Sequence, residues 1–155
     1  MCNLSLFSHC EKCGAICCKA SSTIGAPILS EEEARALEAQ FGNDSVESVR
    51  APNGEIYYIT ADLRGYCAFL QGNQCLAQQN KPMDCLCYPV KAVYGRGKVV
   101  FVIDDNCPAV PCLTDDFIGL AKEVALSSIK RFSPVVFNHW LENFVGWVNN
   151  ARILF

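Results

Sequence analysis

The sequence predicts an α+β protein, a small cysteine-cluster metal-binding domain with a β-hairpin and C-terminal helices. Helical periodicity of apolar residues and short β-branched, aromatic runs both occur along the 155 residues, and together they indicate a mixed class. Eleven cysteines fall in residues 2–18 and 67–112, and the rest of the chain has none. Because a chain of this length can bury a core of its own, we expect one domain over residues 1–155.

The first cysteine-free stretch is expected to open on a helix. Residues 30–33, Ser-Glu-Glu-Glu, form a capping box, in which the serine hydroxyl and the third glutamate carboxylate accept hydrogen bonds from backbone N–H groups at the helix start. The apolar face follows at spacings of three and four: Ala34, Leu37 and Phe41. Gly42 suits the left-handed position that ends many helices.

Three strands are expected after this helix. Residues 55–60 are rich in isoleucine and tyrosine and follow the turn signal Asn53-Gly54. Residues 90–94 and 98–104 predict the two strands of a hairpin, since the second is a β-branched and aromatic run. Gly95-Arg96-Gly97 between them supplies the turn.

Two helices are expected over residues 114–155, packed on the cysteine-bearing part of the chain. The first is capped by Thr114 or Asp115 and runs to about Arg131, and the second starts at Ser133-Pro134. Their apolar stripes are Ile118, Ala121, Ala125 and Ile129, and then Val136, Trp140, Phe144 and Val148. We interpret both stripes as core packing, with a partner-docking surface as the alternative.

Composition and charge exclude several classes of protein. Hydrophobic residues make up 51% of the chain and charged residues 19%, which excludes extended disorder. The net charge of −3 leaves no basic excess for nucleic acid or an anionic membrane surface, so neither is an expected partner. No apolar run approaches the roughly 18–20 residues that span a bilayer.

The N-terminal residues predict the cellular compartment, and the compartment determines the chemistry expected of the cysteines. Residues 1–7 have neither the basic nor the apolar region of a secretory signal, so we expect a cytoplasmic protein. In that reducing compartment clustered cysteines are metal ligands or redox groups more often than disulfides. The odd number of cysteines also fits poorly with complete pairing, although a disulfide scaffold remains an alternative.

The strongest local pattern is the run from Cys10 to Cys18. Cys10 and Cys13 are two residues apart and followed by Gly14, a knuckle in which two thiolates converge on one metal while backbone amides point at sulfur. The adjacent Cys17 and Cys18 point apart, so they serve two neighbouring centres or one of them bridges.

Eight cysteines make two sets of four, which fits two tetrahedral zinc sites or two four-cysteine iron–sulfur clusters of the 4Fe-4S type. The predicted metal ligands are Cys10, Cys13, Cys17, Cys18, Cys67, Cys75, Cys85 and Cys107. Cys2, Cys87 and Cys112 remain, with Cys87 the best candidate for a ninth ligand. The cofactor is therefore zinc or iron, and the expected partners are metal ions, with a protein partner left open.

Eight thiolates around two divalent ions carry a net charge of about −4. Cationic side chains near the thiolates would offset this charge. The basic residues close in sequence to the predicted ligands are Lys12, Lys19, Arg64, Lys81 and Lys91. Ordinary surface solubility is the alternative role for all of them.

The ordered pattern resembles the zinc- or iron-chelating cysteine-cluster family, also called the CxxCxxCC or YkgJ-type family, over residues 10–108. The matching pieces are Cys10-x2-Cys13-Gly14, Cys17-Cys18, Ser30-Glu31-Glu32-Glu33, Cys67-Ala-Phe-Leu70, Cys75, Lys81-Pro-Met-Asp-Cys85-Leu-Cys87-Tyr-Pro89 and Cys107-Pro108. Lys81 and Leu86 stand where the family often has arginine. The resemblance implies metal chelation by this region without a settled reaction.

A reaction is not apparent from the remaining residues. His9 precedes the first ligand and fits a surface group or a ligand's neighbour, with a substitute metal ligand as the alternative, while His139 fits the edge of the core. There is no glycine-rich phosphate loop after a strand and no Gly-x-Ser-x-Gly elbow. We therefore expect a metal-binding protein of unknown reaction. The alternative, which the family resemblance suggests, is an iron–sulfur enzyme or accessory protein related to protein lysine methyltransferases.

Overall fold

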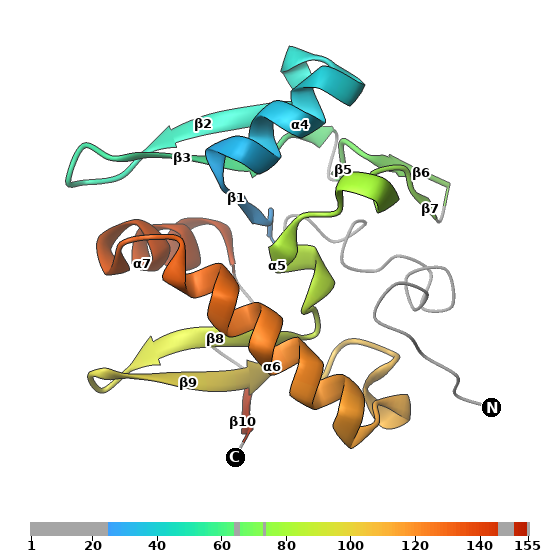
Figure 1. Ribbon diagram of the computed structural model, residues 1–155, viewed down its shortest axis with the longest axis vertical. Helices are drawn as coiled ribbons and strands as arrows, with labels where there is room; N and C mark the ends of the chain where they lie inside the picture. The colour runs from blue at the N-terminus through green and yellow to red at the C-terminus, as the bar shows by residue number, and fades with distance from the viewer. Residues whose placement is uncertain (1–24, 64–65, 73, 146–150, 155) are drawn as a thin grey trace.

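The computed structural model describes residues 25–63, 66–72, 74–145 and 151–154, and it confirms the α+β class. Figure 1 shows one sheet with a helix beside it at the top and a second sheet crossed by a long helix at the bottom. A one-turn helix, α5, lies between these two halves.

The upper half is a three-stranded antiparallel sheet in the order β1-β3-β2 with helix α4 (Figure 1). Its elements are β1 (Ile28–Leu29), α4 (Glu31–Phe41), the short 3-10 helix η1 (Asn43–Ser45), β2 (Val46–Arg50) and β3 (Ile56–Thr60). The predicted strand over 55–60 corresponds to β3, so this prediction is confirmed. Its partner β2 was not predicted.

The capping box at the start of α4 is confirmed. The Ser30 hydroxyl accepts from the Glu33 N–H, and the Glu33 carboxylate accepts from the Ser30 N–H, each at 3.2 Å. At the other end Gly42 has a φ of 96° and donates its N–H to the Glu38 carbonyl. Glycine is favoured there because side chains with a Cβ rarely adopt this φ.

Two short hairpins connect the halves. Their elements are β4 (Asp62–Leu63) with β5 (Tyr66–Cys67), and β6 (Leu70–Gln71) with β7 (Gln74–Cys75), followed by the 3-10 helix η2 (Gln78–Asn80) and α5 (Met83–Leu86). These segments carry the Cys-x-Phe-Leu motif and the second cysteine-rich run of the sequence.

The lower sheet is antiparallel in the order β10-β9-β8. The predicted hairpin is β8 (Val90–Gly95) with β9 (Lys98–Ile103), and the unpredicted edge strand is β10 (Arg152–Leu154). The turn has two residues rather than the three expected, because Gly95 pairs with Lys98. Arg96 and Gly97 have φ values of 50° and 79°, the left-handed geometry that suits a two-residue hairpin turn.

Both C-terminal helices are confirmed. After the 3-10 helix η3 (Val110–Cys112), α6 (Asp115–Lys130) begins where the Thr114 hydroxyl accepts from the Phe117 N–H. The second helix, α7 (Pro134–Phe144), is capped by the Ser133 hydroxyl. Residue 148, placed in its apolar stripe by the sequence, lies outside the described residues.

The buried side chains form two hydrophobic clusters. The main core lies between the lower sheet, α6, α7 and the β1 and β3 strands, and its largest members are Trp140, Tyr57, Phe137, Ile28, Ile103 and Ile129. The second core joins α4 to the short hairpins and consists of Leu29, Ala34, Leu37, Val46, Phe69, Cys75 and Ala77. The predicted stripes face the main core with one correction: Phe117 rather than Ile118 begins the buried face of α6.

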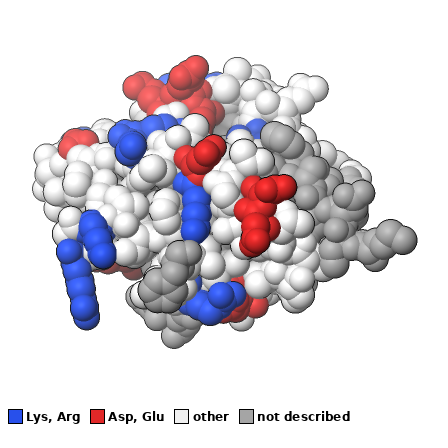
Figure 2. All heavy atoms as spheres, turned by 60° about the horizontal axis from the view of Figure 1, so that its bottom comes forward, with Lys and Arg blue, Asp and Glu red and all other residues white. Residues whose placement is uncertain are grey.

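Charged side chains of both signs are interspersed over the face shown in Figure 2, which suits the small net charge of −3. Arg152 of β10 and Asp105 form a bidentate pair, with two N–H to oxygen distances of 2.9 Å. Within the part of the chain that the structure describes, no helix is both long and apolar enough to cross a membrane.

Candidate metal centre

The structure describes four of the eight predicted ligands: Cys67, Cys75, Cys85 and Cys107. None of the four forms a disulfide, so each sulfur is a thiol. The predicted ligands Cys10, Cys13, Cys17 and Cys18 lie outside the described residues, as do Cys2 and His9.

Cys67 and Cys75 belong to the second core. Cys67 ends β5, and Cys75 ends β7 opposite Leu70. Cys75 is buried in this core, and Cys67 packs against it. Between them in sequence, the Phe69 ring is 2% exposed and its centroid is 4.7 Å from that of Phe41 in α4. Phe69 therefore anchors the loop that joins the two cysteines, which gives the Cys-x-Phe-Leu motif a structural role.

Cys85 and Cys107 come from the two segments that leave the open end of the β8–β9 hairpin. Just beyond the paired strands, the Asp104 N–H donates to the Pro89 carbonyl at 2.9 Å, and the Cys107 N–H donates to the Asp104 carbonyl at 3.1 Å. The Asp104 carboxylate is buried and accepts the Tyr88 hydroxyl at 2.7 Å. These bonds hold the chain before β8 against the chain after β9.

The described cysteines do not by themselves complete a metal-binding group. Among residues 25–63, 66–72, 74–145 and 151–154, no three histidine, cysteine, aspartate or glutamate side chains form a group that could hold a metal ion. A four-coordinate centre that uses any of these four cysteines therefore needs ligands from outside the described residues.

Cys87 and Cys112 differ from the four predicted ligands. Cys87 is 1% exposed, and its thiol donates to the Asp84 carbonyl at 3.3 Å. Burial in the main core, together with the Asp84 charge, raises the pKa of Cys87 to about 12. In this environment Cys87 is a protonated, hydrogen-bonding thiol rather than a thiolate. Cys112, at the end of η3, is disulfide-bonded.

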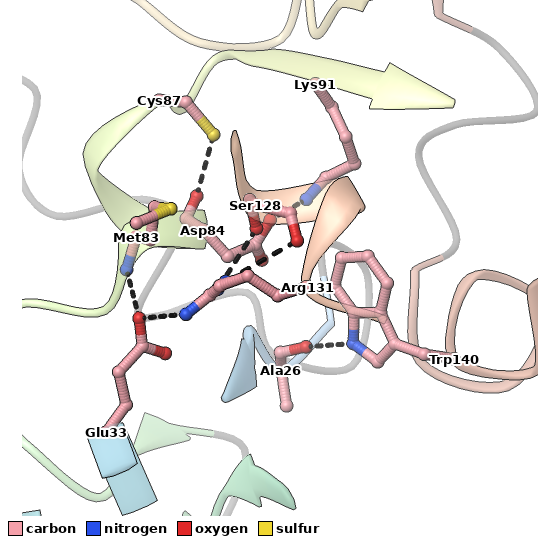
Figure 3. Close-up of polar contacts among 9 residues, drawn as sticks. All are labelled: Ala26, Glu33, Met83, Asp84, Cys87, Lys91, Ser128, Arg131 and Trp140. Carbon is pink, nitrogen blue, oxygen red and sulfur yellow. Dashed lines mark hydrogen bonds and ion pairs between the residues drawn. The ribbon is translucent and has the colours of Figure 1, made fainter. Parts of the chain in front are cut away.

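Figure 3 shows a buried ion pair at Asp84, the residue that precedes Cys85 in the sequence. The Lys91 ammonium contacts the Asp84 carboxylate, and the two residues are 5% and 8% exposed. The same ammonium is 4.3 Å from the centroid of the Trp140 ring. The indole N–H of Trp140 in turn donates to the Ala26 carbonyl at 2.8 Å. These three contacts connect α5 to β8, β8 to α7, and α7 to the segment just before β1.

Glu33 connects three helices at one carboxylate (Figure 3). Besides capping α4, it accepts the Met83 N–H at the start of α5 at 3.2 Å. It also accepts an N–H from Arg131, just after α6, at 2.5 Å. Arg131 donates further to the Ser128 hydroxyl at 3.2 Å. The sequence gives Glu33 a capping role alone, and it gives Arg131 no role beyond the end of a helix.

The sequence predicts that basic residues near the ligands offset the thiolate charge, but Lys91 has a different partner. Its charge is buried opposite Asp84, which excludes surface solubility as its role and leaves little net positive charge for thiolates. Lys81 is half-buried just before α5. Lys12, Lys19 and Arg64 lie outside the described residues.

His139 lies at the edge of the core, as predicted. Its Nδ1 is 2.8 Å from the Tyr57 hydroxyl, a hydrogen bond that joins α7 to β3. Burial raises the pKa of Tyr57 to about 12.

A cleft of about 330 Å³ opens between the end of α7 and strands β2, β3 and β4. Its lining includes the carboxylate residues Glu47, Asp62 and Glu142, and none of the cysteines. It is therefore separate from the candidate metal ligands.

Comparison with family models, with curated proteins and with solved structures finds no match to this chain. The resemblance to the cysteine-cluster family stays a prediction, and the case for function depends on the residues themselves.

Proposed function

We propose that this chain is a metal-binding protein whose clustered cysteines chelate zinc or iron. The observation that supports it is the placement of Cys67 and Cys75 at the second core, of Cys85 in α5 just before the β8–β9 hairpin, and of Cys107 just after it. None of these four cysteines forms a disulfide, and all four stand on ordered backbone. Soft thiolate ligands favour zinc or iron–sulfur clusters over hard cations such as Mg²⁺ or Ca²⁺.

The four described cysteines would supply half of the ligands of two four-cysteine centres. The remaining ligands in this proposal are Cys10, Cys13, Cys17 and Cys18, whose knuckle pattern suits convergence on metal. Two zinc ions or two four-iron clusters then use all eight.

Metal binding of this kind would contribute strongly to folding. Structural zinc in small peptides binds with apparent energies of about 10–16 kcal/mol, whereas whole domains are stable by about 5–15 kcal/mol. The cysteine-bearing segments are short strands and a one-turn helix, which have little stability of their own. We therefore expect the order of the cysteine-bearing segments before β8 and after β9 to depend on bound metal.

Elemental analysis with an anaerobic visible spectrum of the purified chain tests the proposal. Zinc in a colourless sample supports structural chelation. Iron with acid-labile sulfide and a brown colour supports clusters, and it favours the alternative of an iron–sulfur enzyme or accessory protein related to protein lysine methyltransferases. A folded, untreated chain without zinc or iron overturns the proposal.

Single substitutions test the ligand assignment. Cys75→Ser and Cys107→Ser are each expected to lower metal content, because serine oxygen is a poor substitute for thiolate at zinc or iron. Cys87→Ser is the matched control, since this buried thiol makes a hydrogen bond to Asp84 that a hydroxyl can also make. Full retention of metal by Cys75→Ser or Cys107→Ser removes that residue from the ligand set.

A further inference from the structure

The helix that carries Cys85 is too short to fix its own orientation. α5 spans only Met83–Leu86, and a single helical turn is marginal without outside contacts. Its N-cap, Pro82, makes no side-chain cap hydrogen bond. The direction of the Cys85 side chain is therefore set by what holds residues 83 and 84.

Two side-chain contacts hold this turn from opposite ends of the fold (Figure 3). The Glu33 carboxylate of α4 accepts the Met83 N–H. The Lys91 ammonium of β8 holds the Asp84 carboxylate, and both groups are more than nine-tenths buried. Asp84 is adjacent to Cys85, so the ion pair acts one residue from the predicted ligand.

The Lys91 end of this contact is itself fixed. Lys91 belongs to a paired strand, opposite Val102 of β9, and its ammonium lies over the Trp140 ring at 4.3 Å. Because β9 leads directly to the loop of Cys107, one rigid strand pair connects the two cysteines. A contact from Asp84 to β8 therefore sets α5 relative to Cys107.

A buried ion pair is better explained by specificity than by stability. Removing two charges from water costs about as much as their attraction returns, and well-packed apolar residues often serve stability equally well. What an ion pair adds is direction, because it is strong only at one distance and orientation.

We propose that the buried Asp84–Lys91 pair positions the Cys85 thiolate for metal binding. This inference rests on the proposed function. Lys91 and Asp84 are positioning residues rather than ligands; they hold the turn of α5 so that the Cys85 thiolate keeps one direction toward a thiolate-binding divalent metal or cluster. Groups that orient metal ligands in this way typically change metal affinity by ten- to a hundredfold.

The test separates positioning from stability. Lys91→Met alone leaves Asp84 buried without its charge partner, so both stability and metal binding should fall. The double variant Asp84→Asn with Lys91→Met removes both charges at nearly constant volume. We expect it to recover most of the wild-type urea midpoint, while its Co²⁺ affinity, measured by chelator competition, stays ten- to a hundredfold weaker.

The Co²⁺ spectrum provides a second readout. Thiolate-to-cobalt absorption depends on the number and geometry of sulfur ligands, so its bands should shift in the double variant. Ile59→Ala, a main-core substitution in β3, is the stability control: it should lower the urea midpoint and leave the cobalt bands and affinity of the folded chain unchanged.

Asp84→Glu makes the result independent of how well the double variant folds. It keeps the charge pair but moves the carboxylate by one methylene, so we expect a folded chain with weaker Co²⁺ binding. Wild-type cobalt affinity and spectrum in either the double variant or Asp84→Glu overturn the positioning role. A wild-type chain that binds neither Co²⁺ nor Zn²⁺ overturns the proposed function itself, which is a distinguishable result.

Discussion

Lys91 is a charged residue buried in the fold, and only 5% of it is exposed to solvent. Its ammonium is balanced by Asp84 and faces the Trp140 ring. Lys91→Met should therefore destabilise the fold by about 3–5 kcal/mol, because it leaves an uncompensated buried carboxylate. Urea unfolding at neutral pH measures this, with the double variant Asp84→Asn, Lys91→Met expected within about 1–2 kcal/mol of wild type. A single-variant loss below about 1 kcal/mol would contradict the burial of the pair.

Tyr57 gives the molecule a pH dependence at the alkaline end. Its pKa is raised from the ordinary 10.0 to about 12, because burial disfavours the phenolate. Its contribution to stability is therefore complete below pH 10 and is lost as the pH rises to about 12, where the unfolded chain ionises first.

Tyr57→Phe removes this titration. Unfolding midpoints between pH 9 and 12 should fall less steeply for Tyr57→Phe than for wild type, while at pH 8 the variant loses about 1 kcal/mol with the His139 hydrogen bond. Tyr58→Phe, on the opposite face of β3, is the control and should keep the wild-type slope. Parallel curves for Tyr57→Phe and wild type would contradict the assignment.

At the scale of elements, the capping box of α4 does more than start a helix. Ser30→Ala should cost about 1 kcal/mol, the usual loss for a helix cap. Glu33→Ala should cost more, about 2–3 kcal/mol, because Glu33 also accepts the Met83 N–H and pairs with Arg131. Urea unfolding compares the two, and the exposed Glu32→Ala should change stability by less than about 0.5 kcal/mol. Equal losses for Ser30→Ala and Glu33→Ala would mean that the long-range contacts are unimportant.

Elements with strong local signals could be predicted, and those that depend on distant partners could not. The caps at Ser30, Thr114 and Ser133, and the hairpin strands β8 and β9, follow from local residues and are confirmed. The two-residue strands β4 to β7 are too short to show a periodicity. Strand β10 forms by pairing with the edge of β9, which is distant in sequence. Local patterns contain no information about such pairings.

The same reasoning applies to the candidate site. Cysteine spacing predicts which sulfurs could bind metal, because ligand spacing is a local property. The contacts around α5 join Glu33, Met83 and Arg131 across 98 residues of sequence separation, and the spacing pattern contains no signal for them. Lys91 was named as a nearby cation, but its burial against Asp84 could not be predicted from position alone.

For the whole molecule, the cysteine-bearing segments should respond to removal of metal more than the long strands and helices of the main core. A chelator under reducing conditions should speed amide hydrogen exchange in residues 74–87 and 104–112, which are short segments beside the described cysteines. Exchange in β3 and α6 should change little, since these elements belong to the extensive main core. Mass spectrometry of peptides from loaded and stripped protein measures this. Unchanged exchange in residues 74–87 and 104–112 would contradict a structural role for the metal.

The fluorescence of Trp140 should report on the contacts that connect it, through Lys91, to the Asp84 carboxylate next to Cys85. Indole fluorescence responds to a nearby positive charge and to hydrogen bonding at nitrogen, and Trp140 has both, from Lys91 and from the Ala26 carbonyl. The chain has two tryptophans, so Trp147→Phe leaves Trp140 as the single emitter. Emission from this variant can then test in real time, without an attached dye, whether the chain takes up zinc as proposed.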